Sequence, residues 1–277
     1  MGNEWSLVFF TVISQAGIGL MTANQLFNRQ RLALNKILFC ILSLTVISMG
    51  VSLTHLGSPF NSYAAIFNLA NSWLSRENLF LGLFLALTSL VFFFNIRSEK
   101  GSPPVIGWLA VAAGLLCLIS MANVYTNTAF AAWETFYTHL LFYTTAAALG
   151  SLVYAVLVWQ PAKQKQDTAV SQSLVLGIAA IILQIISLLA YVIVLSNGSA
   201  AMQQSLALLA AQLPLLICSQ IITFLAIAGV VFCLHRYQQE RIDNTNTLLN
   251  MSLFAIVITA VILRYLFYSC GVLPMGI

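Results

Sequence analysis

Ionisable side chains lie where several apolar segments of this sequence begin and end. His55 follows one apolar segment, and Glu77 precedes the next. An imidazole gains and loses protons near neutral pH, and so does a carboxylate when burial makes its charge costly. Such groups suit a site that oxidises a quinol, because that reaction releases two protons together with two electrons. We therefore take His55 and Glu77 as candidate proton acceptors.

Four further polar residues accompany these two at segment ends: Arg76, Glu134, His139 and Arg264. Arg264 lies in an otherwise apolar segment and has two interpretations. It either binds a carboxylate (Glu77 or Glu134) or a quinone oxygen, or it extends to the lipid headgroups. His139 either closes a quinol pocket or makes an interfacial hydrogen bond.

The composition shows what kind of scaffold must position these residues. Only 6% of the 277 residues are charged and 60% are hydrophobic, whereas soluble domains average about 25% charged residues. This composition excludes a water-soluble protein. The net charge of +4 reflects loops beside a membrane and does not predict nucleic-acid binding.

The apolar segments predict an all-α polytopic transmembrane bundle of eight helices, forming one transmembrane domain over residues 1–277. The helices are expected at about 5–27, 37–56, 78–97, 105–124, 138–159, 170–195, 211–234 and 247–268. We interpret residues 58–75 as interfacial because they are too polar to cross. The first segment lacks a basic region and a cleavage site, which predicts a retained helix.

Basic residues predict the orientation of the bundle. Alternate connections hold nine of the eleven: Arg29, Arg31, Lys36, Arg97, Lys100, Lys163, Lys165, Arg236 and Arg241. Such connections face the cytoplasm, so both termini should be periplasmic, along with residues 57–77, 125–137 and 196–210. Four aromatic residues of the second of these segments are expected in the interfacial belt or, alternatively, stacked on a quinone: Tyr125, Trp133, Phe136 and Tyr137.

The possible metal ligands are few and scattered. Five cysteines stand singly and without a CxxC pair, so we expect packed apolar thiols and no iron–sulfur cluster or metal site in this chain: Cys40, Cys117, Cys218, Cys233 and Cys270. A b-type haem needs paired histidines. Of the three in the sequence, His55 and His139 are both expected near the outer face and could in principle meet, whereas His235 stands alone at the inner end of a helix. We therefore predict no haem. Gln15, Gly17 and Gly19 are interpreted as helix-packing residues.

Three blocks of sequence resemble one family. His55-Leu56-Gly57-Ser58-Pro59, followed by Ser75-Arg76-Glu77, is similar to the DmsC family, the membrane anchor subunits of dimethyl sulfoxide reductases. The runs from Leu7 to Gln15 and from Arg264 to Tyr268 resemble that family's first and last helices. The resemblance covers essentially the whole chain.

The resemblance implies a function and a set of partners. It implies a bacterial inner-membrane anchor that oxidises menaquinol near the periplasmic face through His55 and Glu77, with Gly57, Ser58 and Pro59 shaping the pocket. It also implies a four-cluster iron–sulfur subunit and a molybdopterin catalytic subunit, docked at the outer loops. Many relatives carry a basic residue where this chain has Asn61, and Arg76 is then the candidate substitute.

Three other functions remain as rivals. A secondary transporter would place ionisable groups near the midplane of the membrane and show internal repeats. An anchor with haem b would oxidise quinol through a bound haem, and a purely structural anchor would have lost quinol chemistry. The terminal acceptor is set by the catalytic subunit, so dimethyl sulfoxide, trimethylamine oxide and selenate are all compatible with this sequence.

Overall fold

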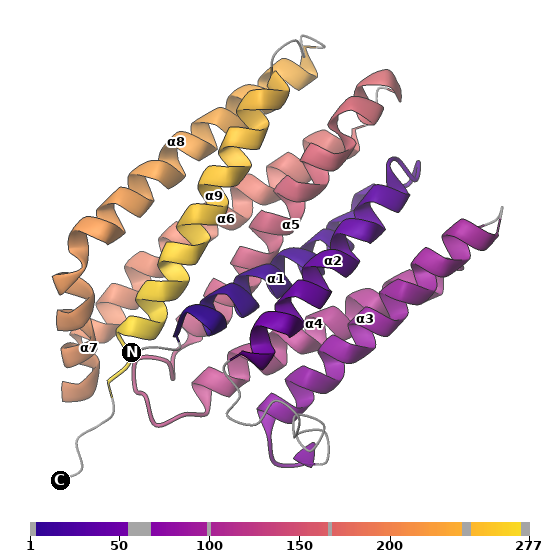
Figure 1. Ribbon diagram of the computed structural model, residues 1–277. Helices are drawn as coiled ribbons and strands as arrows, with labels where there is room; N and C mark the ends of the chain where they lie inside the picture. The colour runs from indigo at the N-terminus through magenta and orange to yellow at the C-terminus, as the bar shows by residue number, and fades with distance from the viewer. Residues whose placement is uncertain (1–3, 55–67, 99–100, 166–167, 240–244, 273–277) are drawn as a thin grey trace.

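The computed structural model describes residues 4–54, 68–98, 101–165, 168–239 and 245–272, and its regular elements are all α-helices (Figure 1). In sequence order these are α1 (Glu4–Phe27), α2 (Leu34–Leu53), α3 (Trp73–Arg97), α4 (Pro104–Thr126), α5 (Phe136–Lys165), α6 (Ala169–Ser196), α7 (Ala200–Ala211), α8 (Leu213–Gln238) and α9 (Thr245–Ser269). Eight of them are long and apolar enough to cross a membrane. The predicted all-α bundle of eight spans is confirmed.

Two helix starts differ from the predicted ones for a local reason. Helix α3 begins at Trp73 because the Ser72 side chain caps it, accepting the backbone N–H of Ser75 at 3.2 Å. Ser199 caps α7 in the same way, 3.4 Å from the N–H of Met202, within a segment predicted as a connection. The early start of α3 matters for function, because it brings Arg76 and Glu77 inside the helix and not before it.

The centre of the bundle is formed by α1 and α5, whose spans are mostly buried by other helices. Helices α8 and α9 lie on one flank and α3 and α4 on the other (Figure 1). Glycines allow α1 and α5 to cross at backbone contact. A Cβ atom on Gly19 would fall on the carbonyl group of Ala146, and one on Gly150 would fall on the backbone of Gly19. The predicted packing role of Gly19 is confirmed.

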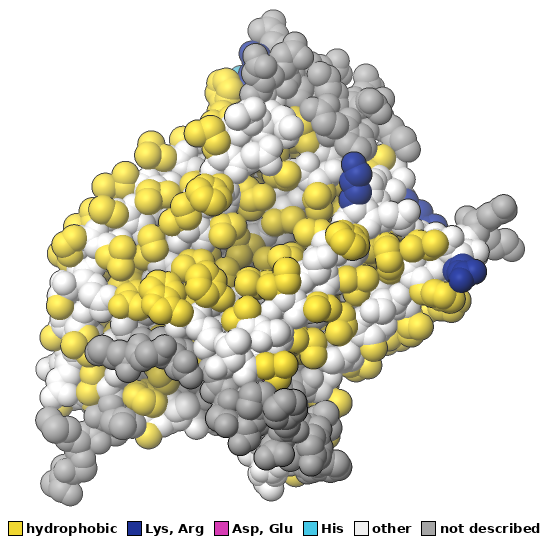
Figure 2. All heavy atoms as spheres, viewed as in Figure 1, with side chains coloured by type: hydrophobic (Ala, Val, Ile, Leu, Met, Phe, Trp, Pro, Cys, Tyr) yellow, Lys and Arg dark blue, Asp and Glu magenta, His cyan; other side chains and the backbone are white. Residues whose placement is uncertain are grey.

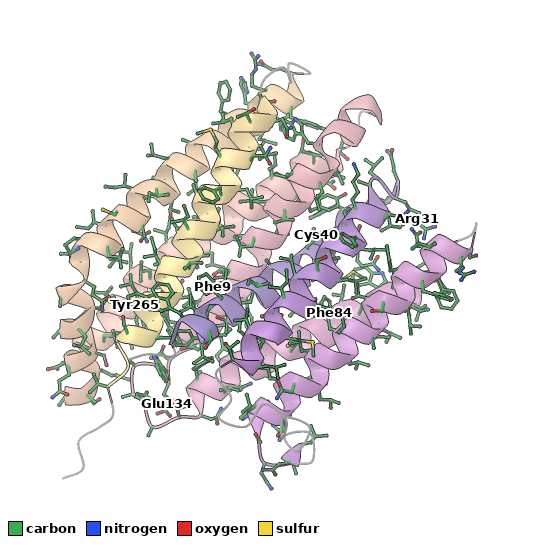
Figure 3. The ribbon with its side chains drawn as sticks, viewed as in Figure 1. Phe9, Arg31, Cys40, Phe84, Glu134 and Tyr265 are labelled. Atoms are coloured by element: carbon green, nitrogen blue, oxygen red, sulfur yellow. The ribbon has the colours of Figure 1, made fainter. Side chains whose placement is uncertain are left out.

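The outer surface of the bundle is apolar along the length of its helices. Phe39, Leu225 and Phe254 expose 64%, 69% and 67% of their surfaces. Figure 2 shows hydrophobic side chains over the visible face, with Lys and Arg side chains toward one end. That end carries Arg31 (Figure 3) and the basic last turns of α3 and α8. The surface is that of a multi-pass membrane protein.

The cysteines largely match the predicted packed thiols. Cys117, Cys233 and Cys270 are buried and Cys40 is half-buried, whereas Cys218 is exposed on the apolar surface of α8. Burial raises the pKa of the Cys270 thiol to about 11. This thiol therefore stays protonated at neutral pH, as expected of a packing residue.

Candidate functional site

The structure describes some of the predicted site residues and not others. His55, Gly57, Ser58, Pro59 and Asn61 lie outside the described residues. The structure does place Glu77, Arg76, Arg264, His139 and Glu134.

Glu77 is a buried carboxylate, 4% exposed, on the face of α3 that packs against α4. The thiol of Cys117 on α4 lies 3.7 Å from the backbone oxygen of Glu77. The carboxylate is close enough to the hydroxyls of Tyr125 and Tyr268 to interact with them electrostatically. Within the described part of the protein, no hydrogen bond or ion pair to this carboxylate is found. Glu77 thus has the burial that a proton-exchanging carboxylate needs.

Arg76, the neighbour of Glu77, binds the backbone of the turn that precedes α3. Its Nε donates to the backbone oxygen of Leu69 at 2.8 Å, and its Nη2 donates to that of Ala70 at 2.7 Å. The guanidinium also stacks over Trp73, with its Cζ 4.1 Å from the ring centroid. Arg76 therefore holds the turn that enters α3, and the suggested replacement of the family's basic residue by Arg76 stays a prediction.

Arg264 is buried inside the bundle and only 1% exposed, so the interpretation that it extends to the headgroups is wrong. Its Nη2 donates to the side-chain oxygen of Gln15 on α1 at 2.8 Å. Its Cζ lies 3.7 Å from the centroid of the Phe142 ring, which gives a cation–π contact. Among the described residues no carboxylate forms an ion pair with it. The predicted pairing with Glu77 or Glu134 is therefore not seen as a direct contact.

A pair of tyrosine hydroxyls is buried in the same part of the bundle as Arg264. The hydroxyl of Tyr268 on α9 donates to that of Tyr125 on α4 at 2.8 Å. Both tyrosines are buried, and both interact electrostatically with Arg264 and with Glu77. The ring of Tyr125 also packs on Phe142, the ring beneath the guanidinium, with centroids 5.6 Å apart. These side chains form one buried polar group, which we call the Arg264 cluster: Gln15, Tyr125, Arg264 and Tyr268.

His139 and Glu134 lie apart from this cluster. Glu134 is exposed on the connection before α5 (Figure 3). His139 is half-buried in α5, and its Nδ1 lies 2.9 Å from the hydroxyl of Tyr143 on the same helix. Helix α5 is not among the helices that pack closely against α3. The structure thus places His139 and Glu134 outside the Arg264 cluster.

The predicted aromatic belt is mostly wrong. The side chain of Trp133 donates to the backbone oxygen of Phe267 at 2.8 Å, and Tyr137 stacks on Tyr191 with centroids 4.1 Å apart. With Tyr125 in the Arg264 cluster, only Phe136, which is 74% exposed, faces outward. These aromatic rings pack between the end of α9 and helices α4, α5 and α6.

Gln15 and Tyr268 were not recognised as candidate functional residues from the sequence, and Tyr125 was considered only as an interfacial ring or one that stacks on a quinone. Gln15 carried a signal, because an amide inside an apolar span is costly unless it is paired. The tyrosines carried none, because a tyrosine near a membrane edge is usually an interfacial residue. Which way each helix is rotated about its axis decides these contacts, and the structure was needed to show that Gln15 meets Arg264 and that Tyr125 meets Tyr268.

The described residues contain no group of three or more His, Cys, Asp or Glu side chains that could hold a metal ion. His139 lies near the start of α5, whereas His235 lies in the last turn of α8, at the other end of the bundle, beside Gln239. These two histidines cannot ligate one haem together.

Comparison with known protein families identifies the family of this chain. The model of the family described as "DMSO reductase anchor subunit (DmsC)" matches residues 1–270. This chain belongs to the DmsC family. The match includes every helix of the bundle and all the residues of the Arg264 cluster, so the family resemblance predicted from three short blocks is confirmed.

Two relatives from anaerobic dimethyl sulfoxide reductases are similar to this DmsC-family protein over part of its length. One is a subunit of the anaerobic dimethyl sulfoxide reductase of Haemophilus influenzae, 31% identical over 175 residues, which is 59% of this chain and 61% of the relative. The other is the YnfH subunit of an anaerobic dimethyl sulfoxide reductase of Escherichia coli, 29% identical over 173 residues, 57% of this chain and 60% of the relative. The match thus spans about three fifths of the length of each relative.

Proposed function

We propose that this DmsC-family protein anchors a dimethyl sulfoxide reductase-type respiratory complex in the bacterial inner membrane and oxidises menaquinol for it at the periplasmic side. The anchor is a single transmembrane domain with both termini periplasmic. It transfers electrons to a four-cluster iron–sulfur subunit, which reduces a molybdopterin catalytic subunit.

The observation that supports this proposal best is the burial of Glu77. A carboxylate inside an apolar bundle, without a hydrogen bond among the described residues, is costly in its charged form and readily holds a proton. A structural anchor has no need of such a group. A quinol site needs one beside an apolar surface that receives the isoprenoid tail.

The chemistry proposed at this site balances as follows. A menaquinol loses two electrons and two protons and leaves as menaquinone. One proton is accepted by the imidazole of His55 and the other by the carboxylate of Glu77, and both then pass to the periplasm. The two electrons leave for the iron–sulfur subunit. For the electrons to leave directly, that subunit must dock at the outer end of the bundle.

The first test measures quinol binding. Replacing His55 with alanine should weaken the binding of a menaquinol analogue to the purified complex by about tenfold, which corresponds to the loss of one hydrogen bond to a ring oxygen. His235→Ala removes an exposed histidine at the opposite end and is the matched control. The complex should co-purify with both proposed partners. Equal affinities in the His55 and His235 variants would show that the quinol does not bind here.

The second test concerns haem. His139 and His235 lie at opposite ends of the bundle, and His55 lies outside the described residues. We propose that the anchor transfers electrons without a b-type haem. The reduced-minus-oxidised absorbance spectrum of the purified complex should then lack the bands of haem b. Stoichiometric haem b that co-purifies with the anchor would contradict the proposal.

A further inference from the structure

The Arg264 cluster leaves buried hydrogen-bond donors without acceptors. Among the described residues, Nε and Nη1 of Arg264 and the side-chain nitrogen of Gln15 have no partner. A charged guanidinium at membrane depth is costly, and such groups usually pair with an opposite charge. Here the neighbours of a full positive charge are one amide oxygen, the rings of Phe142 and Phe267 and the hydroxyl of Tyr268, all of them neutral. The cluster therefore lacks an anion.

Glu77 is the carboxylate that can supply this charge. The other titratable or charged groups around it are few: Arg76 on its own helix, Cys117 and Tyr125 on α4, and Tyr268 and Arg264 on α9. Arg76 is bound to backbone oxygens, and Cys117 is a buried thiol. On the far side of the cluster, Arg264 also interacts with Tyr137 of α5. The hydroxyls of Tyr125 and Tyr268 are thus the groups that interact electrostatically with both Glu77 and Arg264.

The hydroxyl pair can provide such a link. The hydroxyls of Tyr268 and Tyr125 are hydrogen-bonded to each other, 2.8 Å apart, and either hydroxyl can be the donor because its proton rotates. When Tyr268 is the donor, the proton of the Tyr125 hydroxyl is available to Glu77. The oxygen of Tyr268 remains able to accept a hydrogen bond from the guanidinium. A series of hydrogen bonds in which every donor points the same way polarises its members cooperatively and carries the influence of the cation to its far end. A direct Arg264–Glu77 contact is then unnecessary.

We propose that Arg264 is a positioning residue for proton release at Glu77, acting as its counter-charge through the hydroxyls of Tyr268 and Tyr125. This inference rests on the proposed quinol oxidation, in which Glu77 accepts and then releases a proton. When the proton leaves Glu77 for the periplasm, the Tyr125 hydroxyl donates to the new carboxylate. Tyr268 donates to Tyr125, and the guanidinium donates to Tyr268. No covalent bond forms, and Arg264 keeps its protons throughout.

The test follows the protonation of Glu77 directly. In the purified complex, the infrared carbonyl band of a protonated carboxylic acid can be assigned to Glu77 by its loss in Glu77→Gln and then titrated with pH. Arg264→Gln and Tyr125→Phe should each move the midpoint of this titration upward by about one pH unit or more, because each removes stabilisation of the charged form. The pH below which the rate of quinol oxidation falls should move upward by a similar amount. Arg264→Lys, which keeps the charge, should move both by less.

The matched control is Tyr191→Phe. It removes another buried hydroxyl at the same end of the bundle, one that donates to the backbone oxygen of Ala132 at 3.1 Å. This control should titrate like the parent. If an Arg264 variant fails to assemble, Tyr125→Phe and Tyr268→Phe carry the test, because both keep the packed ring.

Two failures can be told apart. If Glu77→Gln oxidises quinol at the parental rate, the proposed function of Glu77 is wrong, whatever the infrared titration shows. If Glu77→Gln abolishes quinol oxidation, yet Arg264→Gln, Tyr125→Phe and Tyr268→Phe all titrate like the parent, the counter-charge proposal is overturned and the quinol site stands.

Discussion

Replacing Glu77 with glutamine should reduce quinol-dependent electron transfer by about 100-fold or more, the usual contribution of a general acid–base group. Glutamine keeps the shape of the side chain but cannot accept the proton that leaves the quinol. Because the carboxylate has no hydrogen-bond partner among the described residues, the substitution should leave folding and assembly unchanged. The rate of reduction of the iron–sulfur clusters by a menaquinol analogue measures the effect.

The protein provides a matched control for this substitution. Glu134→Gln removes a carboxylate from the same end of the bundle, but from an exposed position. This variant should reduce the clusters at the parental rate, with the amount of assembled complex measured in both. Equal losses of activity in the two variants would indicate a general effect of surface charge, and unchanged activity in Glu77→Gln would remove Glu77 from the mechanism.

The second large effect is expected at the crossing of α1 and α5. Gly19→Val places a side chain where the carbonyl group of Ala146 lies, so the two central helices must separate. Overpacking usually costs about 1–3 kcal/mol when side chains can move, and the cost should reach or exceed the top of that range here because the obstacle is backbone. The midpoint of thermal unfolding in detergent, followed by size-exclusion chromatography, measures the loss.

The control is again a residue of the same type. Gly82 lies on α3 with open space where a Cβ atom would be added, so Gly82→Val tests valine in a membrane-spanning helix without the collision. It should unfold near the parental temperature. If Gly19→Val unfolds at the same temperature as Gly82→Val, the backbone contact between α1 and α5 contributes little to stability.

The fold was predictable because it depends on properties that the sequence shows directly. The length and apolar character of each segment predicted eight spans, and the structure contains them. The helix ends were less accurate, since they depend on caps such as Ser72. That difference is small in residues, but it moves Glu77 from a connection to the buried face of α3.

The site was predictable only in its parts. Residue type identified Glu77 and Arg264, because charged groups in apolar segments are rare and costly. Their surroundings depend on helix rotation and on contacts between distant segments, which no local pattern shows. Gln15 and Arg264 are 249 positions apart, and the Tyr125–Tyr268 pair also joins segments far apart in the sequence. The roles proposed for His55, His139 and Glu134 stay predictions.

The bond between Gln15 and Arg264 also bears on how the protein is made. It joins α1, which the ribosome delivers early, to α9, which emerges last of the helices described. Until α9 inserts, the side-chain oxygen of Gln15 and the hydroxyl of Tyr125 lack the partners that Arg264 and Tyr268 supply. An incomplete polypeptide therefore exposes polar groups to lipid and should be recognised by membrane proteases, whereas the finished protein encloses them. One interior contact would in this way distinguish mature anchors from aborted ones before any partner subunit is recruited.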